Sequence, residues 1–297
     1  MSHMSAAVGD EAHAEERETA LEEAHRLLAG CPSLSALPHI LCEDGPLLAV
    51  HKPAGLLTQG VPHGIITLEA WVRQYLKTRY HKPGNVYLGI PHRLDRPVSG
   101  VVVFARNSKA ASRLAEQFQQ HRVQKIYWCL TRGIPEPAEQ ELIDWLWKEP
   151  ERAHVRVVPA GTPAAREARL HYRTLATGDG VAWLEIRLFT GRMHQIRVQL
   201  ASRGWPIVGD NQYASAGEPA HPREQRGRVV VPHAFPGYHA QPPWIALHAH
   251  TLTVYHPIRY DTVTLHALPP YHWRALHVPE RLLRQLITAA DPSRARC

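Results

Sequence analysis

The stretch His92-Arg93-Leu94-Asp95-Arg96-Pro97-Val98-Ser99-Gly100-Val101-Val102-Val103-Phe104-Ala105 joins a charged loop to an apolar run. The run at residues 101–105 is typical of a strand that is buried on both faces. In the loop before it, Asp95 lies between Arg93 and Arg96, and neighbouring cations keep a carboxylate ionised. A surface salt bridge explains the same charges equally well, so this stretch alone leaves a functional and a structural interpretation open.

The segments before and after this stretch predict an alternation of strands and helices. Residues 47–51 predict a short strand, which ends at 52–55 because proline and glycine interrupt regular structure. A helix is predicted from Thr67, whose hydroxyl can cap the first turn. Its buried stripe comprises Leu68, Trp71, Val72, Tyr75 and Leu76. Asn107 or Ser108 is expected to cap a second helix, whose buried face comprises Ala111, Leu114, Ala115 and Phe118.

The second half of the chain continues the pattern. Residues 124–130 and 182–188 predict strands, and in the first of them Tyr127 points to the face opposite Ile126. A helix is expected at about 193–202, because Gly204 is typical of a helix end. A strand near 252–255 and a last helix from about 279 follow, the helix with Leu282, Leu283, Leu286 and Ile287 on its apolar face. This order predicts a single α/β or α+β domain.

The chain is expected to fall into three parts. Residues 1–38 form an acidic arm and linker, helical or disordered, and residues 39–275 form the main domain. Within that domain, residues 214–243 are rich in Pro, Gly, His and Arg and predict a long loop, which is typically functional or disordered. Residues 276–297 are expected to form the C-terminal helix and tail.

Composition limits the class of protein. The net charge of +7 lies mainly in the body of the chain, because residues 10–24 are acidic, and a basic body fits a polyanionic partner. No apolar stretch approaches the roughly 20 residues of a membrane span, and the N-terminus has no apolar segment of a secretory signal. We therefore expect a cytoplasmic protein with no membrane contact. The four cysteines show no CxxC or CxxH pattern, which argues against a zinc ribbon or a redox motif.

Two more polar segments stand beside elements of the predicted core. Tyr127, in Lys125-Ile126-Tyr127, can face a cleft, although a half-buried core tyrosine is the commoner case. On the predicted helix His194 and Arg197 are i, i+3 neighbours, and an arginine there can hold a carboxylate by two hydrogen bonds. A solvated helix face explains the same residues. Residue chemistry alone thus indicates a cleft enzyme or an RNA binder with an Asp–Arg pair.

Taken together, these segments resemble the RluA-type RNA pseudouridine synthases. The family motifs are an HRLDR-x-[ST]-SG loop, a K-x-Y strand, a TGR-x-HQIR-V segment and a following G-x-PI-x-GD-x-x-Y segment. The chain carries them in order at residues 92–100, 125–127, 190–198 and 204–213. Residues 52–55 are similar to the family's KPAG segment, and Leu247-His248-Ala249 and His256-Pro257 are similar to its LHA and HP segments.

The resemblance implies one catalytic domain, built on a mixed, mostly antiparallel sheet with flanking helices and a central RNA-binding cleft. It implies isomerisation of a uridine in rRNA or tRNA by base flipping, cleavage of the glycosidic bond and reattachment through carbon 5. No cofactor and no metal are implied, and we expect the protein to act on RNA as a monomer.

The motif positions also imply the site residues. Asp95 corresponds to the carboxylate that starts glycosidic cleavage, by attack on C1′, addition to the base or removal of the 2′ proton. Tyr127 corresponds to the tyrosine that lies against the base and helps to remove the carbon 5 proton, and Arg197 to the arginine that keeps the Asp ionised. Arg93 is expected to occupy the gap left by the flipped nucleotide. The other expected RNA contacts are His92, Arg96, Arg192, His194 and Gln195.

Two departures from the family pattern are visible. Val98 stands where threonine is commoner, which removes a hydroxyl but no catalytic group. No S4 RNA-binding domain is expected at the N-terminus, so the RNA grip would come from the catalytic domain, residues 214–243 and the C-terminal helix. A catalytically idle RNA-binding or RNA-chaperone protein of the same fold is the alternative. Metal-dependent hydrolysis, suggested by 21 histidines, is disfavoured because His248 and His250 have no nearby carboxylates in the sequence.

Overall fold

A computed structural model describes residues 38–60, 67–214, 244–268, 273, 279, 281–282 and 285–286, and these contain one ten-stranded sheet. The strands along the first half of the chain are β1 (His39–Asp44), β2 (Leu47–Lys52), β3 (Ser99–Ala105), β4 (Gln124–Arg132) and β5 (Glu139–Lys148). The others are β6 (Val155–Val158), β7 (Arg166–Gly178), β8 (Val181–Leu188), β9 (Leu247–Tyr255) and β10 (Thr262–His266). The helices with full bounds are α2 (Leu68–Arg79), α3 (Ser108–Gln119) and α4 (Gln195–Ala201).

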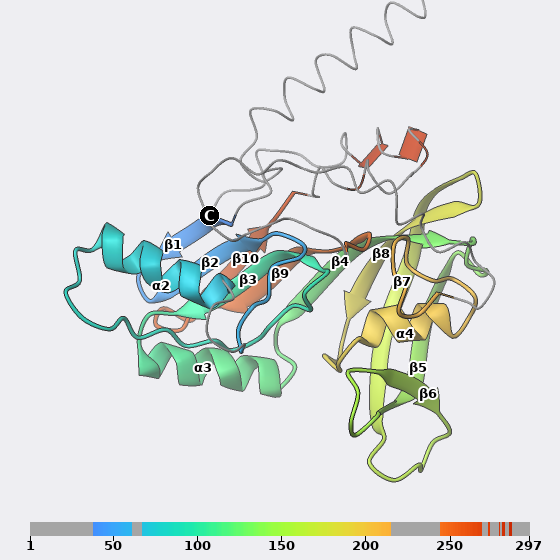
Figure 1. The fold of residues 1–297 in the computed structure, drawn as a ribbon, viewed down its shortest axis with the longest axis horizontal. Coiled ribbons are helices and arrows are strands. Elements are labelled where there is room, and N and C mark those ends of the chain that lie inside the picture. Colours follow the sequence, from blue (N-terminus) through green and yellow to red (C-terminus); the bar gives the residue numbers. More distant parts are fainter. Residues whose placement is uncertain are drawn as a thin grey trace, which may run out of the picture.

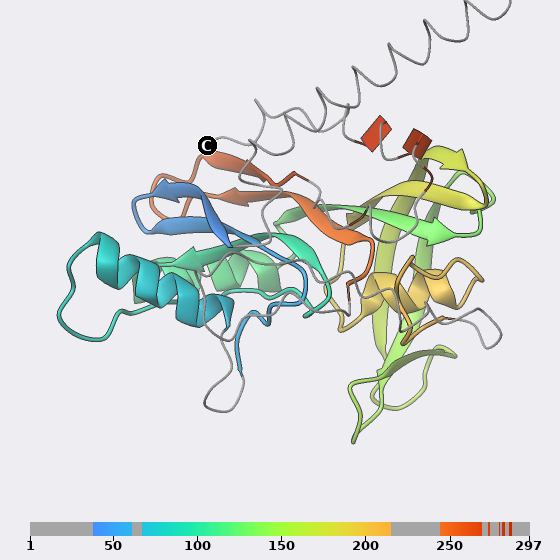
Figure 2. The same ribbon diagram turned by 45° about the horizontal axis from the view of Figure 1, so that its top comes forward.

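The sheet joins two halves through strand β4 (Figures 1 and 2). Its strand order is β1-β2-β3-β9-β4-β8-β7-β5-β6, with β10 paired to β9. Among the described strands, only β3 and β9 pair in parallel, and they do so over two residue pairs. The mixed, mostly antiparallel sheet predicted from the sequence is therefore confirmed.

Alternation along β2 and β3 determines how the first half is layered. Leu48 and Val102 lie in one core cluster with Leu68 and Val72 of α2, whereas Ala49 and Val103 lie in another with Ala110 and Leu114 of α3. Successive strand residues face opposite sides, so both faces of these strands are covered by a helix and the predicted continuous apolar run is explained. Figure 1 shows α2 and α3 on this half of the sheet.

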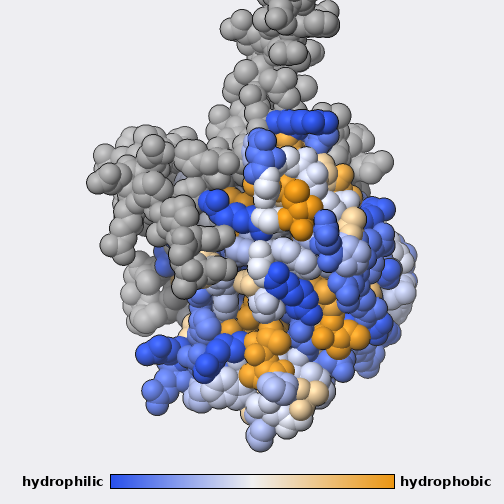
Figure 3. Space-filling view, turned by 90° about the vertical axis from the view of Figure 1, so that its right-hand side faces the viewer, coloured by the Kyte–Doolittle hydropathy of each residue, from blue (hydrophilic) through white to orange (hydrophobic). Residues whose placement is uncertain are grey.

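In the second half, helix α4 packs on β5 and β6. Its Ile196 and Leu200 join a cluster with Leu170 and Tyr172 of β7, and Val198 packs with Leu146 of β5. The outward-facing residues of these strands are more exposed, and Ile143 is 56% exposed. Figure 3 shows this end of the molecule, where separate hydrophobic patches lie among hydrophilic side chains.

The predicted elements are found with shifted ends, and one helix face was wrong in part. Thr67 and Asn107 cap α2 and α3 as expected, with side-chain oxygens that accept from Ala70 and Ala110. On α3, Gln117 is buried while Ala115 is exposed, because Gln117 bonds the backbone of Tyr255 at the end of β9. The arm at 1–37 and most of the 214–243 segment lie outside the described residues, as do Leu283 and Ile287, whereas Leu282 and Leu286 are buried.

Gly100 is the residue that lets β3 approach β9. Its φ is +126°, a conformation that L side chains rarely adopt, and a Cβ atom there would lie 2.3 Å from the carbonyl oxygen of Ala249. The parallel pairing of Ser99 with His248 and of Gly100 with Ala249 therefore requires a glycine. No helix in the described part of the chain is long and apolar enough to cross a membrane.

Candidate active site

Asp95 lies on the loop that enters β3, and the segment after β2 holds this loop in place. The ammonium of Lys52, which is fully buried, donates to the carbonyl oxygens of Pro53 at 2.9 Å, Leu56 at 2.7 Å and Arg96 at 3.2 Å. Burial lowers the pKa of Lys52 to about 7, although the charge of Asp95 acts in the opposite direction. A buried ammonium with three acceptors thus joins the 52–56 turn to the backbone beside Asp95.

Direct contacts reinforce this connection. The amide of Gly55 donates to the carbonyl oxygen of Arg96 at 2.7 Å, and the Thr58 hydroxyl donates to the carbonyl oxygen of Leu94 at 2.9 Å. The backbone on both sides of Asp95 is therefore fixed by hydrogen bonds, which preorganises the carboxylate.

The opposite wall is the turn between β8 and α4. The helix predicted from Met193 begins instead at Gln195, because His194 has a left-handed backbone with a φ of 51°. Gln195 closes the turn: its Oε1 accepts from the Thr190 hydroxyl at 2.7 Å and from the Arg192 amide at 3.0 Å. His194 and Arg197 still converge, but through this turn and not through helical periodicity.

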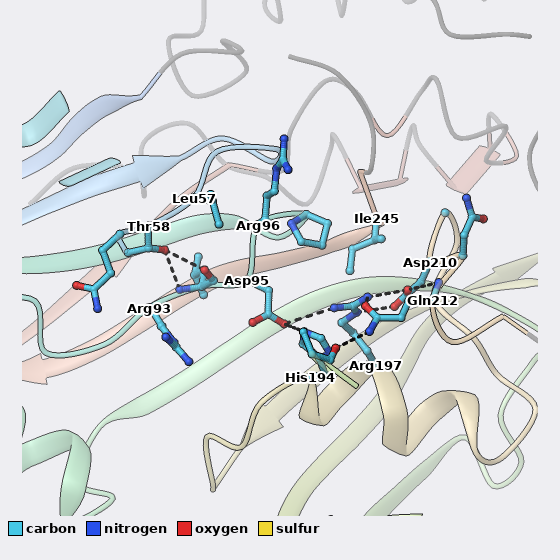
Figure 4. A pocket seen from close by; sticks show the side chains of 16 residues that line it. Leu57, Thr58, Arg93, Asp95, Arg96, His194, Arg197, Asp210, Gln212 and Ile245 are labelled. Carbon is cyan, nitrogen blue, oxygen red and sulfur yellow. Dashed lines mark hydrogen bonds and ion pairs between the residues drawn. The ribbon is translucent and has the colours of Figure 1, made fainter. Parts of the chain in front are cut away.

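The carboxylate of Asp95 lies between His194 and Arg197 (Figure 4). Its Oδ2 is 3.7 Å from Nε2 of His194 and 3.7 Å from a terminal nitrogen of Arg197. The expectation that the flanking arginines hold the carboxylate is not met, since Figure 4 shows Arg93 and Arg96 pointing away from it. Both are exposed, and Arg96 donates through Nε to the carbonyl oxygen of Gly55 at 3.1 Å.

Arg197 is shared between two carboxylates. Its side chain is 5% exposed, and Nε and a terminal nitrogen donate to the Asp210 carboxylate at 2.6 and 2.8 Å. The second of these nitrogens also donates to Gln212 at 2.9 Å, which leaves the other terminal nitrogen for Asp95. Burial opposes the charge of Arg197, but these carboxylates raise its pKa and keep it a cation.

Two pockets meet at Asp95. The larger, of about 590 Å³, is lined by residues that include Thr58, Asp95, Arg197 and Asp210. The smaller, of about 100 Å³, is lined by residues that include Asp95, Tyr127 and Arg197, so the three predicted catalytic residues share one cavity. Burial, and then the charge of Asp95, raise the pKa of Tyr127, which therefore stands as a neutral phenol.

Known proteins are similar to this chain in sequence and in fold. The sequence profile of the RNA pseudouridylate synthase family matches residues 46–202, which include Asp95, Tyr127 and Arg197. The chain belongs to this family. Its members are isomerases that act on RNA. Because the chain is also similar to RluA of Escherichia coli over most of its length, it is an RluA-type pseudouridine synthase.

Individual relatives align with most of the length of this pseudouridine synthase. A Synechocystis protein named as an uncharacterized RNA pseudouridine synthase is 31% identical over 92% of this chain and 80% of its own length. The dual-specificity RNA pseudouridine synthase RluA of Escherichia coli is 31% identical over 77% of this chain and 91% of its own. Human RNA pseudouridylate synthase domain containing 4 shares the fold, with a TM-score of 0.63 at 22% identity over 86% of this chain and 96% of its own. Other relatives carry mitochondrial and chloroplastic names, so location varies within the family and a cytoplasmic location stays a prediction.

The expected RNA contacts of the pseudouridine synthase fall into two groups. Arg93 is exposed and lines both pockets, and Arg192 lines the smaller one. His92 and Gln195 use their polar atoms inside the protein: Nε2 of His92 accepts from the amide of Val103 at 3.0 Å, and Gln195 closes the turn before α4. RNA contact by these two side chains would break those bonds.

Four polar residues of the site were missed as site residues in the sequence. They are Lys52, Lys125, Asp210 and Tyr213. Each lies inside one of the family motifs quoted above, so the motifs could have pointed to these residues. The motif sequences alone, however, do not indicate what each residue does. Lys125 donates to the carbonyl oxygen of Thr190 at 3.3 Å, and burial lowers its pKa to about 8.

Proposed function

We propose that Asp95 is the catalytic carboxylate of this pseudouridine synthase, and that it acts with Tyr127 and Arg197 on a flipped uridine in rRNA or tRNA. The carrying observation is that Asp95 is the one acidic side chain among the described residues that line the small cavity. The volume of that cavity, about 100 Å³, suits one base and no more, which fits an enzyme that flips its target base out of the stack.

The chemistry requires an ionised carboxylate. The N1–C1′ bond of the uridine breaks, C5 forms a new bond to C1′, and the C5 hydrogen is lost while N1 gains a proton. Whether Asp95 attacks C1′, adds to the base or removes the 2′ proton, it must begin without a proton. Arg197 at 3.7 Å supplies positive charge beside the carboxylate, and an opposite charge favours the ionised form.

Tyr127 is placed for contact with the base. Its neutral phenol can pack against a base and donate a hydrogen bond. Tyr127 can remove the C5 proton only if its own hydroxyl hydrogen passes to another acceptor at the same time. Loss of the charge of Asp95, to a covalent bond or a proton, would make this easier, because that charge, after burial, raises the pKa of Tyr127. This order places the action of Asp95 before that of Tyr127.

RNA binding is proposed to involve the rim of the pockets. Arg93 is exposed beside both cavities and suits the space that a flipped nucleotide leaves in its helix. Arg192 and Lys125 add positive charge near the smaller cavity. Contacts of this kind predict that RNA affinity falls as salt is raised.

The test is release of tritium from RNA that carries uridine labelled at carbon 5. We expect Asp95→Asn to lose release, whereas Asp179→Asn, at an exposed turn where asparagine tolerates a positive φ, should retain it. Release that survives Asp95→Asn contradicts the assignment of the carboxylate. No release from any cellular RNA by the wild type would favour the idle RNA-binding alternative.

The RNA target can be found by mapping pseudouridine in cells with and without the gene. We expect loss of one or a few sites in rRNA or tRNA. A map that is unchanged in both RNA classes would contradict this substrate proposal.

A further inference from the structure

Tyr213 and His194 form a short hydrogen-bonded chain behind the carboxylate of Asp95. The amide of Val155 donates to the Tyr213 hydroxyl oxygen at 3.1 Å, and that hydroxyl lies 2.7 Å from Nδ1 of His194. An amide can only donate, so the oxygen of Tyr213 accepts from Val155 and its single hydrogen is available to Nδ1. The Tyr213 oxygen could also accept from an Nδ1–H group, but Nε2 faces the carboxylate of Asp95, which only accepts. This favours the tautomer of a neutral His194 that carries its proton on Nε2 and accepts at Nδ1.

The Nε2–H group faces the catalytic carboxylate. It lies 3.7 Å from Oδ2 of Asp95, which is an ion-pair distance but too long for a hydrogen bond. Catalytic hydrogen bonds are often long without substrate and shorten in the reacting complex. Arg197 makes two of its bonds to Asp210. Among the described residues, Asp95 is the one carboxylate within ion-pair distance of His194, so His194 gives Asp95 a donor that it does not share.

Tyr213 and Arg197 help to fix the position of His194 at the wall of the two pockets. Its side chain is 9% exposed, the ring of Tyr213 meets it edge to face at 5.6 Å, and the guanidinium of Arg197 lies over the Tyr213 ring at 5.0 Å. The backbone of His194 is left-handed, which costs energy in a non-glycine residue and persists where surrounding contacts enforce it. Such a conformation is common at functional sites.

We propose that His194 is a positioning residue, held by Tyr213, whose Nε2–H aims the Asp95 carboxylate and stabilises its negative charge until it reacts. This inference rests on the proposed function of Asp95. In this role His194 acts through Asp95. His194 also lines both pockets, so the RNA contact expected from its motif position stays a prediction.

The groups that face His194 agree with a neutral ring at the start of the reaction. Burial lowers its pKa; Asp95 and Asp210 act in the opposite direction, while Arg197 and His154 lower it further. Burial also raises the pKa of Tyr213 to about 12, so the hydroxyl keeps its hydrogen. In acid His194 becomes a cation that pairs tightly with Asp95, and kcat should fall.

Two substitutions of His194 separate positioning from packing. A glutamine amide nitrogen reaches close to the place of Nε2, whereas an asparagine amide nitrogen reaches only the place of Nδ1. We expect H194Q to keep kcat within about tenfold of the wild type, the rate equivalent of one hydrogen bond, and H194N to lose roughly tenfold more. Asparagine tolerates a left-handed backbone better than glutamine, so this order cannot come from backbone preference.

Tyr213→Phe tests the other end of the chain. It removes one oxygen and should lower kcat by about tenfold with little change in KM for the RNA, because the donor tautomer of His194 is no longer fixed. Glutamine does not titrate, so in H194Q the fall of kcat in acid that protonation of His194 causes should disappear. Tyr260, which is exposed and lines neither pocket, provides the matched control: Tyr260→Phe should keep wild-type kinetics.

Equal losses in H194Q and H194N would overturn the inference, as would wild-type kcat and pH profile in Y213F. If the His194 variants do not fold, Y213F decides alone. Asp95→Asn is measured beside them: activity in that variant contradicts the proposed function itself. An inactive Asp95→Asn with unaffected Y213F and His194 variants contradicts only the role given to His194.

Discussion

Replacement of Asp210 by asparagine tests how the site divides one positive charge between two carboxylates. Asp210 has a 1% exposed side chain and holds Arg197 through two bonds of 2.6 and 2.8 Å. Removal of one partner of a buried ion pair costs about 3–5 kcal/mol. Asparagine keeps one acceptor oxygen, and Gln212 and Asp95 remain near the guanidinium, so we expect D210N to lower the unfolding free energy by about 3 kcal/mol.

The same substitution should slow catalysis. With Asp210 neutral, Asp95 becomes the one charged carboxylate within ion-pair distance of Arg197 among the described residues, and it should move from 3.7 Å into contact. One charge-assisted hydrogen bond, worth roughly 1.5 kcal/mol, must then be broken before Asp95 reacts, which corresponds to about a tenfold lower kcat. Urea unfolding with linear extrapolation measures the first effect, and tritium release measures the second.

Asp144→Asn is the matched control. Asp144 accepts two bonds from Arg203 at 2.9 and 3.1 Å, just beyond the end of α4, but lies in neither pocket lining. This pair is more exposed, so the loss should be about 1 kcal/mol with kcat unchanged. The charge-sharing argument fails if D210N matches the stability of the wild type, or if both variants lose the same stability and keep full kcat.

Three further predictions follow from the loop, the sheet and the rim. In the wild type the unfolding free energy should rise between about pH 7 and 10, because over this range the unfolded chain binds a proton that folded Lys52 has released. Lys52→Met should remove this rise, which urea unfolding at several pH values measures, with the exposed Lys109→Met as control. Gly100→Ala should leave little folded protein by circular dichroism, whereas Gly84→Ala, with open space around its Cβ, should fold normally. Arg93→Ala should weaken RNA binding and reduce the salt slope by about one, and an unchanged slope would exclude a phosphate contact by this residue.

Elements with one clear periodicity were predictable from the sequence. Helix α2 has a capping threonine and an apolar stripe, and its Leu68, Val72 and Leu76 are buried. Strand β3 is a continuous apolar run because α2 and α3 cover both of its faces. In each case a single local pattern agrees with the tertiary environment, which is why the prediction succeeded.

Strand β5 was missed because it lacks a visible alternation, whereas β7 was missed although it alternates. In β5, Leu142 and Leu146 are buried, but Ile143 is 56% exposed and Trp145 is half-buried, so apolar residues lie on both faces and no alternation is visible. In β7 charged residues such as Arg169 alternate with the core, and their ion pairs to neighbouring strands become apparent only in the folded sheet. Pairing across strands is not encoded in local periodicity.

The sequence predicted the residues of the candidate site, but of their contacts it predicted only the pairing of Asp95 with Arg197. Sequence adjacency suggested that Arg93 and Arg96 hold Asp95, whereas the structure gives that place to His194 and Arg197, about a hundred residues later. Chain neighbours in a tight loop point in different directions, and Figure 4 shows this for both arginines. The position of a cation in space, and not in sequence, decides which carboxylate it stabilises.

The register of the sheet explains why these distant segments meet. Gly100 of β3 pairs with Ala249 of β9, which pairs with Tyr127 of β4, which in turn pairs with Ile186 of β8. This single row carries the loop of Asp95, the ring of Tyr127 and the strand that leads into the turn of His194. Only a glycine at position 100 lets β3 approach β9. A side chain there would push the two strands apart and so move Asp95 away from Tyr127, without contacting either residue. Any folded Gly100 variant should therefore lose tritium release more severely than stability, and proportional losses would show that the row does not align the site.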